Sequence, residues 1–220
     1  MKILNIPQPV SMGLLLTYKC NISCKDCIYA CSPKWKSDWI EIEGTNTVFS
    51  QLAPILNKSA PPYLNQISFS HGLHFTGGEP FLNFDLLLKL TGLARDKNIP
   101  LPFVETNCFW ATSDDKTEEK LTQLKKAGLK GILVSINPFN IEYIPFERIE
   151  RAARISEKIF GHNSIVYQQF YLNLFKKWGL KGTMPFKELV KKINPQKLQG
   201  YIELLPMGNT PYNLGNLYEK

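Results

Sequence analysis

The sequence lacks the features of a membrane or secreted protein. No apolar run among its 220 residues approaches the roughly 20 residues that a transmembrane helix needs. The N-terminus carries neither a long apolar core nor a small-residue cleavage site, so we expect no signal peptide. We therefore expect a cytoplasmic protein with no membrane partner.

Histidine and cysteine are also scarce. None of the three histidines, His71, His74 and His162, pairs with a cysteine in a recognisable nucleophile arrangement, and we expect all three to be structural. The five cysteines are unevenly spaced, and three of them lie close together, which argues against a secreted disulfide framework. This pattern favours reduced thiols that bind metal.

The net charge of +7 comes largely from lysines late in the chain. A basic surface can attract nucleic acid, an acidic peptide or an acidic electron donor. The sequence has no arginine-rich tract and no nucleic-acid-binding motif, so a nucleic-acid partner is not indicated. A solvated face of one or two helices explains the lysines best.

Apolar, β-branched segments alternate with amphipathic ones along the chain. We predict strands at 12–18, 66–76, 101–104, 131–136, 164–167 and 201–205, and helices at 46–58, 83–97, 113–128, 145–161 and 186–193. This alternation predicts a parallel sheet in an α/β fold. Six strands are too few for an eight-stranded barrel, and they favour a partial barrel of six βα units in one domain over 1–220. No G-x-G-x-x-G follows a strand, so a dinucleotide-binding fold has little support.

Three cysteines follow the first predicted strand with the spacing C-x3-C-x2-C. Cys20, Cys24 and Cys27 lie in a loop that we place at 19–31. Three thiolates can hold a [4Fe–4S] cube and leave one iron free, whereas a tetrahedral zinc site needs a fourth ligand, for which Cys31 is a candidate.

Polar and glycine residues follow the other predicted strands at the same edge of the sheet. The second strand ends in Thr76-Gly77-Gly78-Glu79-Pro80, and Glu105-Thr106-Asn107 follows the third. The fourth carries Ser135, and Pro206-Met207-Gly208 follows the sixth. Active sites of parallel α/β sheets lie at the carboxyl ends of the strands, so we expect a site at this edge.

The two motifs, C-x3-C-x2-C and T-G-G-E-P, resemble those of the radical S-adenosylmethionine (radical SAM) superfamily. The resemblance implies a partial (β/α)6 TIM-type barrel in which Cys20, Cys24 and Cys27 bind a [4Fe–4S] cluster. The amino and carboxylate groups of S-adenosylmethionine would then chelate the fourth iron.

The resemblance also implies roles at the rim. Gly77, Gly78 and Glu79 would contact the methionine amino group. Glu105, Asn107 and Ser135 occupy places where the family often binds ribose hydroxyls or the methionine carboxylate. Backbone near Met207 would line the adenine.

The implied activity is reductive cleavage of S-adenosylmethionine to a 5′-deoxyadenosyl radical, which abstracts hydrogen from an unidentified substrate, either a small molecule or a peptide. An electron donor such as a flavodoxin or ferredoxin is implied as well.

The sequence departs from the family pattern in three places. Asp26 stands before the third cysteine, where the family often has an aromatic residue. Asn209 replaces the arginine of a P-M-G-R-A segment found in some members, and no G-x-I-x-G-x-x-E pattern is recognisable near the fifth strand.

Other interpretations remain open from the residues alone. One is a non-catalytic iron–sulfur electron carrier or sensor, although such a protein has no need of the Gly77-Gly78-Glu79-Pro80 segment. Others are the zinc site with Cys31, an activase of a glycyl-radical enzyme and a small-molecule mutase. Cys31 and Cys108 are either buried small side chains or participants in radical transfer or substrate contact.

Overall fold

The computed structural model describes residues 7–60, 65–193 and 204–215. Its elements are, in chain order, β1 (Ser11–Leu15), α1 (Ile42–Ser59), β2 (Gly72–Thr76), the 3-10 helix η1 (Pro80–Asn83), α2 (Phe84–Asp96), β3 (Phe103–Thr106), α3 (Asp114–Ala127), β4 (Gly131–Ser135), α4 (Phe146–Phe160), the 3-10 helix η2 (Gly161–Asn163), β5 (Ser164–Tyr167), α5 (Gln169–Lys177), α6 (Phe186–Lys192) and α8 (Thr210–Leu214).

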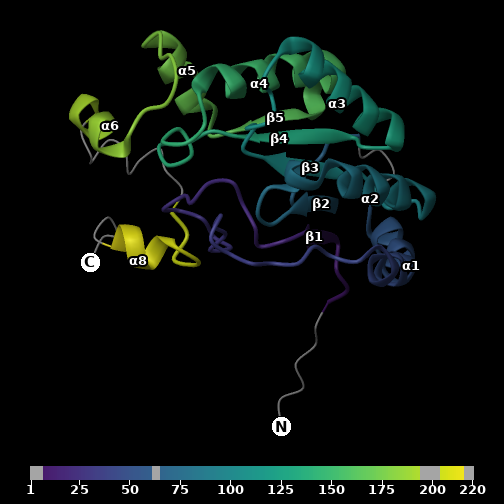
Figure 1. The fold of residues 1–220 in the computed structure, drawn as a ribbon. Helices are drawn as coiled ribbons and strands as arrows, with labels where there is room; N and C mark the ends of the chain where they lie inside the picture. Colours follow the sequence, from purple (N-terminus) through teal and green to yellow (C-terminus); the bar gives the residue numbers. More distant parts are fainter. Residues whose placement is uncertain (1–6, 61–64, 194–203, 216–220) are drawn as a thin grey trace.

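The strands form one parallel sheet in the order β1-β2-β3-β4-β5 (Figure 1). Each strand pairs with the next one in sequence, because the intervening helices return the chain to the same edge of the sheet. The prediction of an α/β fold with a parallel sheet is confirmed.

The two faces of the sheet differ in what they contact. Because successive side chains in a strand point to opposite faces, one set meets the helices and the other lies on the opposite, inner face of the sheet. The helix-facing set includes Phe75, Val104 and Val134, which are fully buried in the main core with apolar residues of α2, α3 and α4. On the opposite face, Phe103 and Leu133 pack with Ile67 in a small separate cluster. The inner face is therefore apolar at its base and leaves room for a cavity above.

Helices α2 and α3 begin and end close to the predicted residues. The Ser113 hydroxyl accepts a hydrogen bond from the Lys116 amide (3.3 Å) at the start of α3, and Gly128 ends that helix with a φ of 123°. Asn83 caps α2 by accepting from the Leu86 amide (3.2 Å). These caps fix the directions in which the helices leave the sheet.

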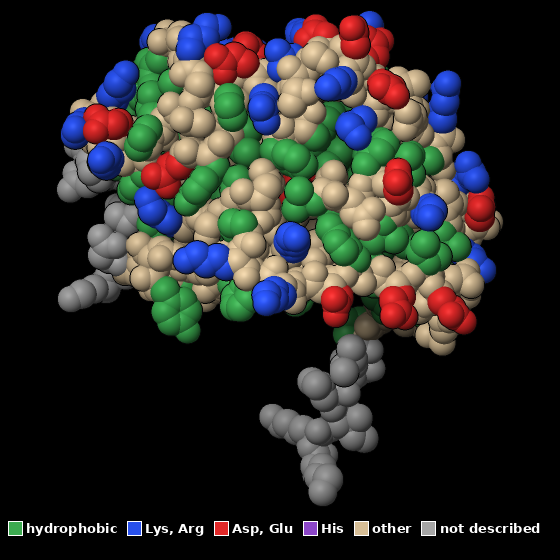
Figure 2. All heavy atoms as spheres, in the orientation of Figure 1, with side chains coloured by type: hydrophobic (Ala, Val, Ile, Leu, Met, Phe, Trp, Pro, Cys, Tyr) green, Lys and Arg blue, Asp and Glu red, His purple; other side chains and the backbone are tan. Residues whose placement is uncertain are grey.

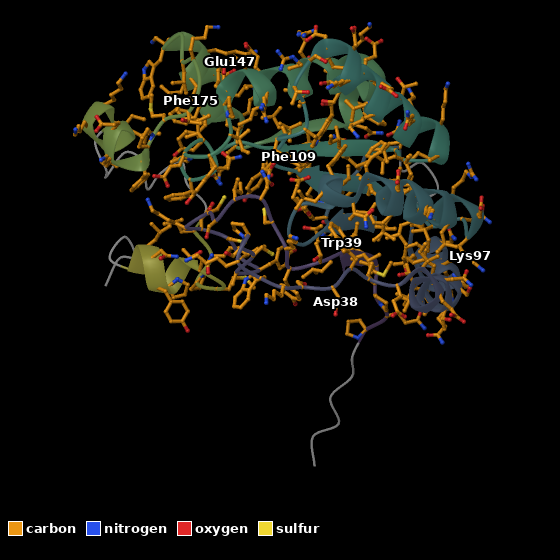
Figure 3. The ribbon with its side chains drawn as sticks, viewed as in Figure 1. Asp38, Trp39, Lys97, Phe109, Glu147 and Phe175 are labelled. Atoms are coloured by element: carbon orange, nitrogen blue, oxygen red, sulfur yellow. The ribbon has the colours of Figure 1, made fainter. Side chains whose placement is uncertain are left out.

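The structure differs from the predicted elements in several places. Strand β1 ends at Leu15 rather than at residue 18, α1 begins at Ile42 rather than at residue 46, β3 spans Phe103–Thr106 rather than 101–104, and α8 was not predicted. The second strand begins only at Gly72, because residues 66–71 form turns and an isolated bridge. Helix α5 was not predicted, and it packs on α4 through an edge-on contact of Phe146 with Phe175 (6.0 Å between ring centroids). Figure 3 shows Phe175 and Glu147, from these two helices, in the same upper layer of the molecule. Residues 201–203 of the predicted sixth strand lie outside the described residues, and Leu204 and Leu205 form no strand.

The surface carries its basic residues in a dispersed way on the face shown in Figure 2, where Lys and Arg are interspersed with acidic and apolar side chains. None of the helices in the described part of the chain combines the length and the apolar content of a membrane span.

Candidate metal centre and cofactor cavity

The three clustered cysteines lie where the chain leaves β1 at the carboxyl edge of the sheet. All three line one cavity of about 440 Å³. Gly77, Gly78 and Glu79 from the end of β2, and Glu105, Asn107 and Ser135 from β3, β4 and the residues that follow β3, line the same cavity. The structure thus brings together the residues that the sequence placed at this edge.

The cluster loop, residues 19–31, is held by backbone hydrogen bonds and by an ion pair with the segment between β4 and α4. Its ends are tied together because the Cys20 amide donates to the Ser32 carbonyl and the Ser32 amide donates to the Tyr18 carbonyl (both 3.4 Å). Lys25 forms an ion pair with Glu142 (3.1 Å). The loop is therefore ordered by contacts that do not involve the thiols.

Gly77 and Gly78 let the end of β2 pack directly on the cluster loop. The Gly78 amide donates to the Thr17 carbonyl (2.7 Å), and the Glu79 amide donates to the Lys19 carbonyl (3.2 Å). Gly77 has a φ of 114°, and a Cβ at Gly78 would lie 1.8 Å from the Lys19 carbonyl oxygen. Only glycines fit this approach of the two backbones.

Glu79 is fully buried and joins β2 to β3. Its Oε1 accepts from the Phe81 amide (3.1 Å) and the Thr106 hydroxyl (2.9 Å), and its Oε2 accepts from the Asn107 amide (2.8 Å). Burial raises the pKa of Glu79 to about 7, against the opposing effect of these donors. The carboxyl group fixes the shape of the cavity wall as well as contributing to it.

The remaining predicted residues take different positions around the cavity. Asn107 reaches the cluster loop, where its Nδ2 donates to Asn21 Oδ1 (2.9 Å) and lies 3.7 Å from Cys20 Sγ. Ser135 lines the cavity, and its carbonyl accepts from Asn140 Nδ2 (2.7 Å). Glu105 also lines the cavity and lies within β3, two positions before Asn107. The Met207 side chain is 48% exposed and is not among the described residues that line the cavity.

The thiols of the three cysteines are in different electrostatic surroundings. Burial raises the pKa of Cys20 to about 12 and raises that of Cys24 well above its usual value. The pKa of Cys27 is lowered to about 6 because the Cys31 thiol and the amides of the following residues donate hydrogen bonds to its sulfur. Iron cations would supply the positive charge that buried thiolates require, so the donor set fits an iron–sulfur cluster.

Cys31 and Cys108 are both buried, in agreement with the interpretation that they are buried small side chains. The Cys31 amide donates to Cys27 Sγ (3.3 Å), and Cys31 lines the cavity. Cys108 is fully buried beside Thr106, with its Sγ 3.8 Å from the Thr106 carbonyl, and it is not among the described residues that line the cavity.

Sequence reasoning missed several side chains that hold the cluster loop. Asp26 accepts from Asn137 Nδ2 (2.7 Å), which connects the loop to the segment after β4. Asn209 Nδ2 donates to the Cys24 carbonyl (3.2 Å), the Asn209 amide donates to the Cys27 carbonyl (2.9 Å), and the Thr210 hydroxyl donates to the Asp26 carbonyl (3.3 Å). Figure 1 shows α8, which Asn209 precedes, beside the loop that follows β1. The substitution of Asn for Arg in the P-M-G segment was the signal available in the sequence.

Within the described residues, no three His, Cys, Asp or Glu side chains converge on a point that would suit a single metal ion. A [4Fe–4S] cube makes a different demand, because each of three thiolates binds its own iron atom and the sulfurs stand apart. Three cysteines around one cavity edge meet that demand.

A family model described as a 4Fe-4S single cluster domain matches residues 12–136. The matched range contains the three cysteines, Gly77 to Glu79, and Ser135. The chain belongs to this family of 4Fe–4S single-cluster domains. Its membership confirms the expected [4Fe–4S] cluster, and it agrees with the resemblance to the radical SAM superfamily. No curated protein matches the chain.

Three solved structures are similar to the chain. BtrN, in complex with AdoMet and 2-DOIA, is 16% identical with a TM-score of 0.46, over 76% of this chain and 57% of BtrN. The protein anSMEcpe, with bound AdoMet and the Cp18Cys peptide, is 16% identical with a TM-score of 0.49, over 78% of this chain and 48% of that one. HydG, a maturase of the [FeFe]-hydrogenase, is 15% identical with a TM-score of 0.47, over 92% of this chain and 50% of HydG. The chain therefore spans about half the length of these proteins.

Proposed function

We propose that the protein is a radical SAM enzyme that binds one [4Fe–4S] cluster through Cys20, Cys24 and Cys27. The observation that carries the proposal is the docking of Gly77–Glu79 on the cluster loop, at the wall of the cavity that the cysteines also line. A cluster bound there supplies one-electron reduction of S-adenosylmethionine, which yields methionine and a 5′-deoxyadenosyl radical.

In this proposal the chain binds and orients S-adenosylmethionine at the rim of the cavity. Backbone carbonyls of Gly77 and Gly78, with Glu79, accept hydrogen bonds from the methionine ammonium group. An ammonium group in a buried site needs such acceptors because it loses its water. Asn107 and Ser135 face the ribose or the carboxylate, and backbone near Met207 contacts the adenine. Glu105, which the resemblance also places at the ribose or the carboxylate, is not assigned to S-adenosylmethionine in this proposal, because it lies within β3, two positions before Asn107.

Part of the cysteine surroundings limits access of water. Cys20 is 7% exposed and Ile22 beside it 6%, whereas Cys24 and Cys27 are half-buried at the cavity. A buried, apolar boundary suits radical chemistry because it keeps competing hydrogen donors and oxygen away from the reacting atoms. We propose that a flavodoxin or a ferredoxin supplies the electron, which the net charge of +7 supports by favouring an acidic donor.

The test is anaerobic reconstitution with iron and sulfide, followed by dithionite and S-adenosylmethionine and an assay for 5′-deoxyadenosine. We expect the product with the wild type and none with Cys24→Ala. Cys108→Ala is the matched control, because it removes a buried cysteine that does not line the cavity, and it should retain the cluster and the product. A loaded cluster that gives no product with excess reductant would contradict the proposal.

A second candidate, an iron–sulfur electron carrier, is favoured by one observation. Cys31 lies against Cys27 and lines the same cavity, so its thiolate could occupy a fourth ligand position. In that case Cys31→Ser would change the electron paramagnetic resonance spectrum of the reduced cluster. Under the enzyme proposal, added S-adenosylmethionine would change that spectrum in the wild type instead.

A further inference from the structure

The inner face of the sheet carries a polar pair below the rim residues. His74 of β2 stands beside Phe103 of β3, and Glu105 of β3 stands beside Leu133 of β4. Both residues line the cavity, and their side chains are only 14% and 22% exposed. Along the strands, the pair lies farther from the carboxyl edge of the sheet than Gly77–Glu79 and Asn107 do.

Glu105 has hydrogen-bonding capacity that the described residues do not use. Its Oε2 accepts from the Thr76 hydroxyl (3.0 Å). Its Oε1 is buried and has no hydrogen-bond partner among the described residues, although His74 Nε2 lies 3.5 Å away. A buried carboxylate oxygen without a donor costs free energy until a ligand supplies one.

The cavity also lacks positive charge in the described part of the chain. Its described lining includes the carboxyl groups of Asp26, Glu79 and Glu105 but no lysine or arginine, in contrast to the net charge of +7. Burial lowers the pKa of His74, which disfavours the charged imidazolium and reduces the counter-charge that His74 gives Glu105. Asp26 accepts a hydrogen bond from Asn137 Nδ2, and the proposed function already assigns Glu79 to the methionine ammonium group. Among these three carboxyl groups, only Glu105 has a buried oxygen without a hydrogen-bond partner in the described part of the chain. A cationic ligand group would find its complement at Glu105.

Aromatic and aliphatic side chains surround the pair. Phe69 packs edge-on against His74 (5.2 Å between ring centroids), and Phe103 stacks on it (5.4 Å). Phe69, Leu133 and Tyr167 line the cavity. A ligand at this depth would therefore place an apolar body on these walls and a polar group on Glu105.

We propose that Glu105 and His74 form a substrate subsite for a primary amine with an apolar or aromatic body. The inference rests on the proposed function, because it takes the cavity as the active site and its rim as the place of S-adenosylmethionine. The ammonium group donates to Glu105 Oε1, and to His74 Nε2 when the ring carries its proton on Nδ1. Thr76 orients the carboxyl group and so links the subsite to the end of β2.

The test measures ligand binding to the cluster-loaded protein, saturated with S-adenosylmethionine, in the absence of reductant. Benzylamine, benzyl alcohol and benzoate are compared by ligand-observed NMR titration at about pH 8, above the pKa of about 7 to which burial raises Glu105. We expect benzylamine to bind about tenfold more tightly than the other two, and Glu105→Gln to lower its affinity about tenfold. The affinity for S-adenosylmethionine and the iron content should stay unchanged. Glu43→Gln on α1, which removes the same charge at an exposed position, should leave benzylamine binding unchanged.

A second variant tests the pair without altering Glu105. A Cβ at Gly13 of β1 would lie 2.6 Å from His74 Nε2, so Gly13→Ala displaces the end of a side chain and no backbone. We expect a smaller loss of benzylamine affinity, about threefold, because the carboxylate remains. If Glu105→Gln does not fold, Gly13→Ala and the preference for benzylamine over benzyl alcohol still test the proposed subsite.

The proposal is overturned if benzylamine shows no preference over benzyl alcohol, or if neither variant weakens its binding. It is also overturned if Glu105→Gln weakens S-adenosylmethionine instead, because Glu105 then serves that ligand. Failure of the proposed function is seen separately as a loaded cluster that gives no 5′-deoxyadenosine, whatever the amine titration shows.

Discussion

Gly78 has no room for a side chain, because its Cα faces the backbone of the cluster loop. A Cβ there would lie 1.8 Å from the Lys19 carbonyl oxygen and 2.5 Å from the Lys19 carbonyl carbon. Backbone atoms cannot move aside as the end of a flexible side chain can. The contact of residue 78 with the cluster loop therefore requires glycine, which has no Cβ.

We therefore predict that Gly78→Ala separates the end of β2 from the cluster loop. The free energy of unfolding should fall by about 3 kcal/mol or more, since the clash involves backbone and also removes two hydrogen bonds. Urea unfolding of the metal-free protein measures the change in the free energy of unfolding, and iron content after reconstitution measures the loss of cluster.

Gly92→Ala is the matched control for this substitution. Gly92 lies within α2, and nothing is within 4 Å of a Cβ built there. Alanine is the better helix former, so this variant should gain up to about 1 kcal/mol. Equal stability of the two variants would contradict the assigned role of Gly78.

At the scale of elements, Asn209 and Thr210 at the start of α8 hold the cluster loop in place, and we call these two residues the brace. Asn209 and Thr210 donate three hydrogen bonds to loop carbonyls, those of Cys24, Asp26 and Cys27. Carbonyls between the cysteines are thereby fixed in direction, and with them the positions from which the thiols project.

We predict that Asn209→Ala speeds the release of iron from the reconstituted protein to a chelator by several-fold. The loss of one side-chain hydrogen bond, worth about 1 kcal/mol, should loosen the loop locally and leave global stability nearly unchanged. The absorbance of the iron–chelator complex follows the rate.

Asn213→Ala serves as the comparison, because Asn213 is exposed on α8 and its side chain bonds only within the segment, to the Asn209 carbonyl. Identical rates for both variants would show that the brace does not act through the Asn209 side chain.

Most elements could be predicted because their sequence signals are local. Strand β4 is an unbroken apolar run, and α3 has Ser113 at its start and Gly128 at its end. Helix α5 was missed because it is only 9 residues long and begins after Gln168 in a left-handed conformation, with no N-capping side chain. Its stability comes from packing of Phe175, which a single sequence does not reveal.

The site was predictable only where a motif carried it. The cysteines and Gly77–Glu79 are read directly from spacing, and the structure brings them to one cavity. No local pattern separates His74 from the other histidines, because its inward direction depends on the register of β2. The bond from Asn137 to Asp26 joins residues 111 positions apart, and no pattern in the chain indicates it.

For the whole molecule, burial of Glu105 makes stability depend on pH. Burial raises the pKa of Glu105 to about 7 from its ordinary value of 4.5, so the folded state binds a proton that the unfolded state releases. The contribution is fully present below pH 4.5 and is lost as the pH rises toward 7. His74, whose pKa burial lowers, contributes in the opposite direction as the pH falls below its usual value.

We predict that the metal-free wild type loses up to about 3 kcal/mol relative to Glu105→Gln as the pH is raised across this window. Titrating groups that do not contact Glu105 are common to both proteins and cancel in the difference, whereas His74, 3.5 Å from Glu105, contributes to it. Urea unfolding of both proteins at several pH values between the two pKa values measures it. A difference that stays constant with pH would mean that Glu105 titrates normally in the folded state.

The brace from Asn209 and Thr210 also bears on the order in which the molecule matures. The cysteines leave the ribosome early, but the donors to their loop are made about 180 residues later. Until then, the carbonyls of Cys24, Asp26 and Cys27 lack these partners, and closure of such a distant contact is slow compared with local folding. A chain that has been made only up to residue 208 therefore lacks three of the hydrogen bonds that hold its cluster loop.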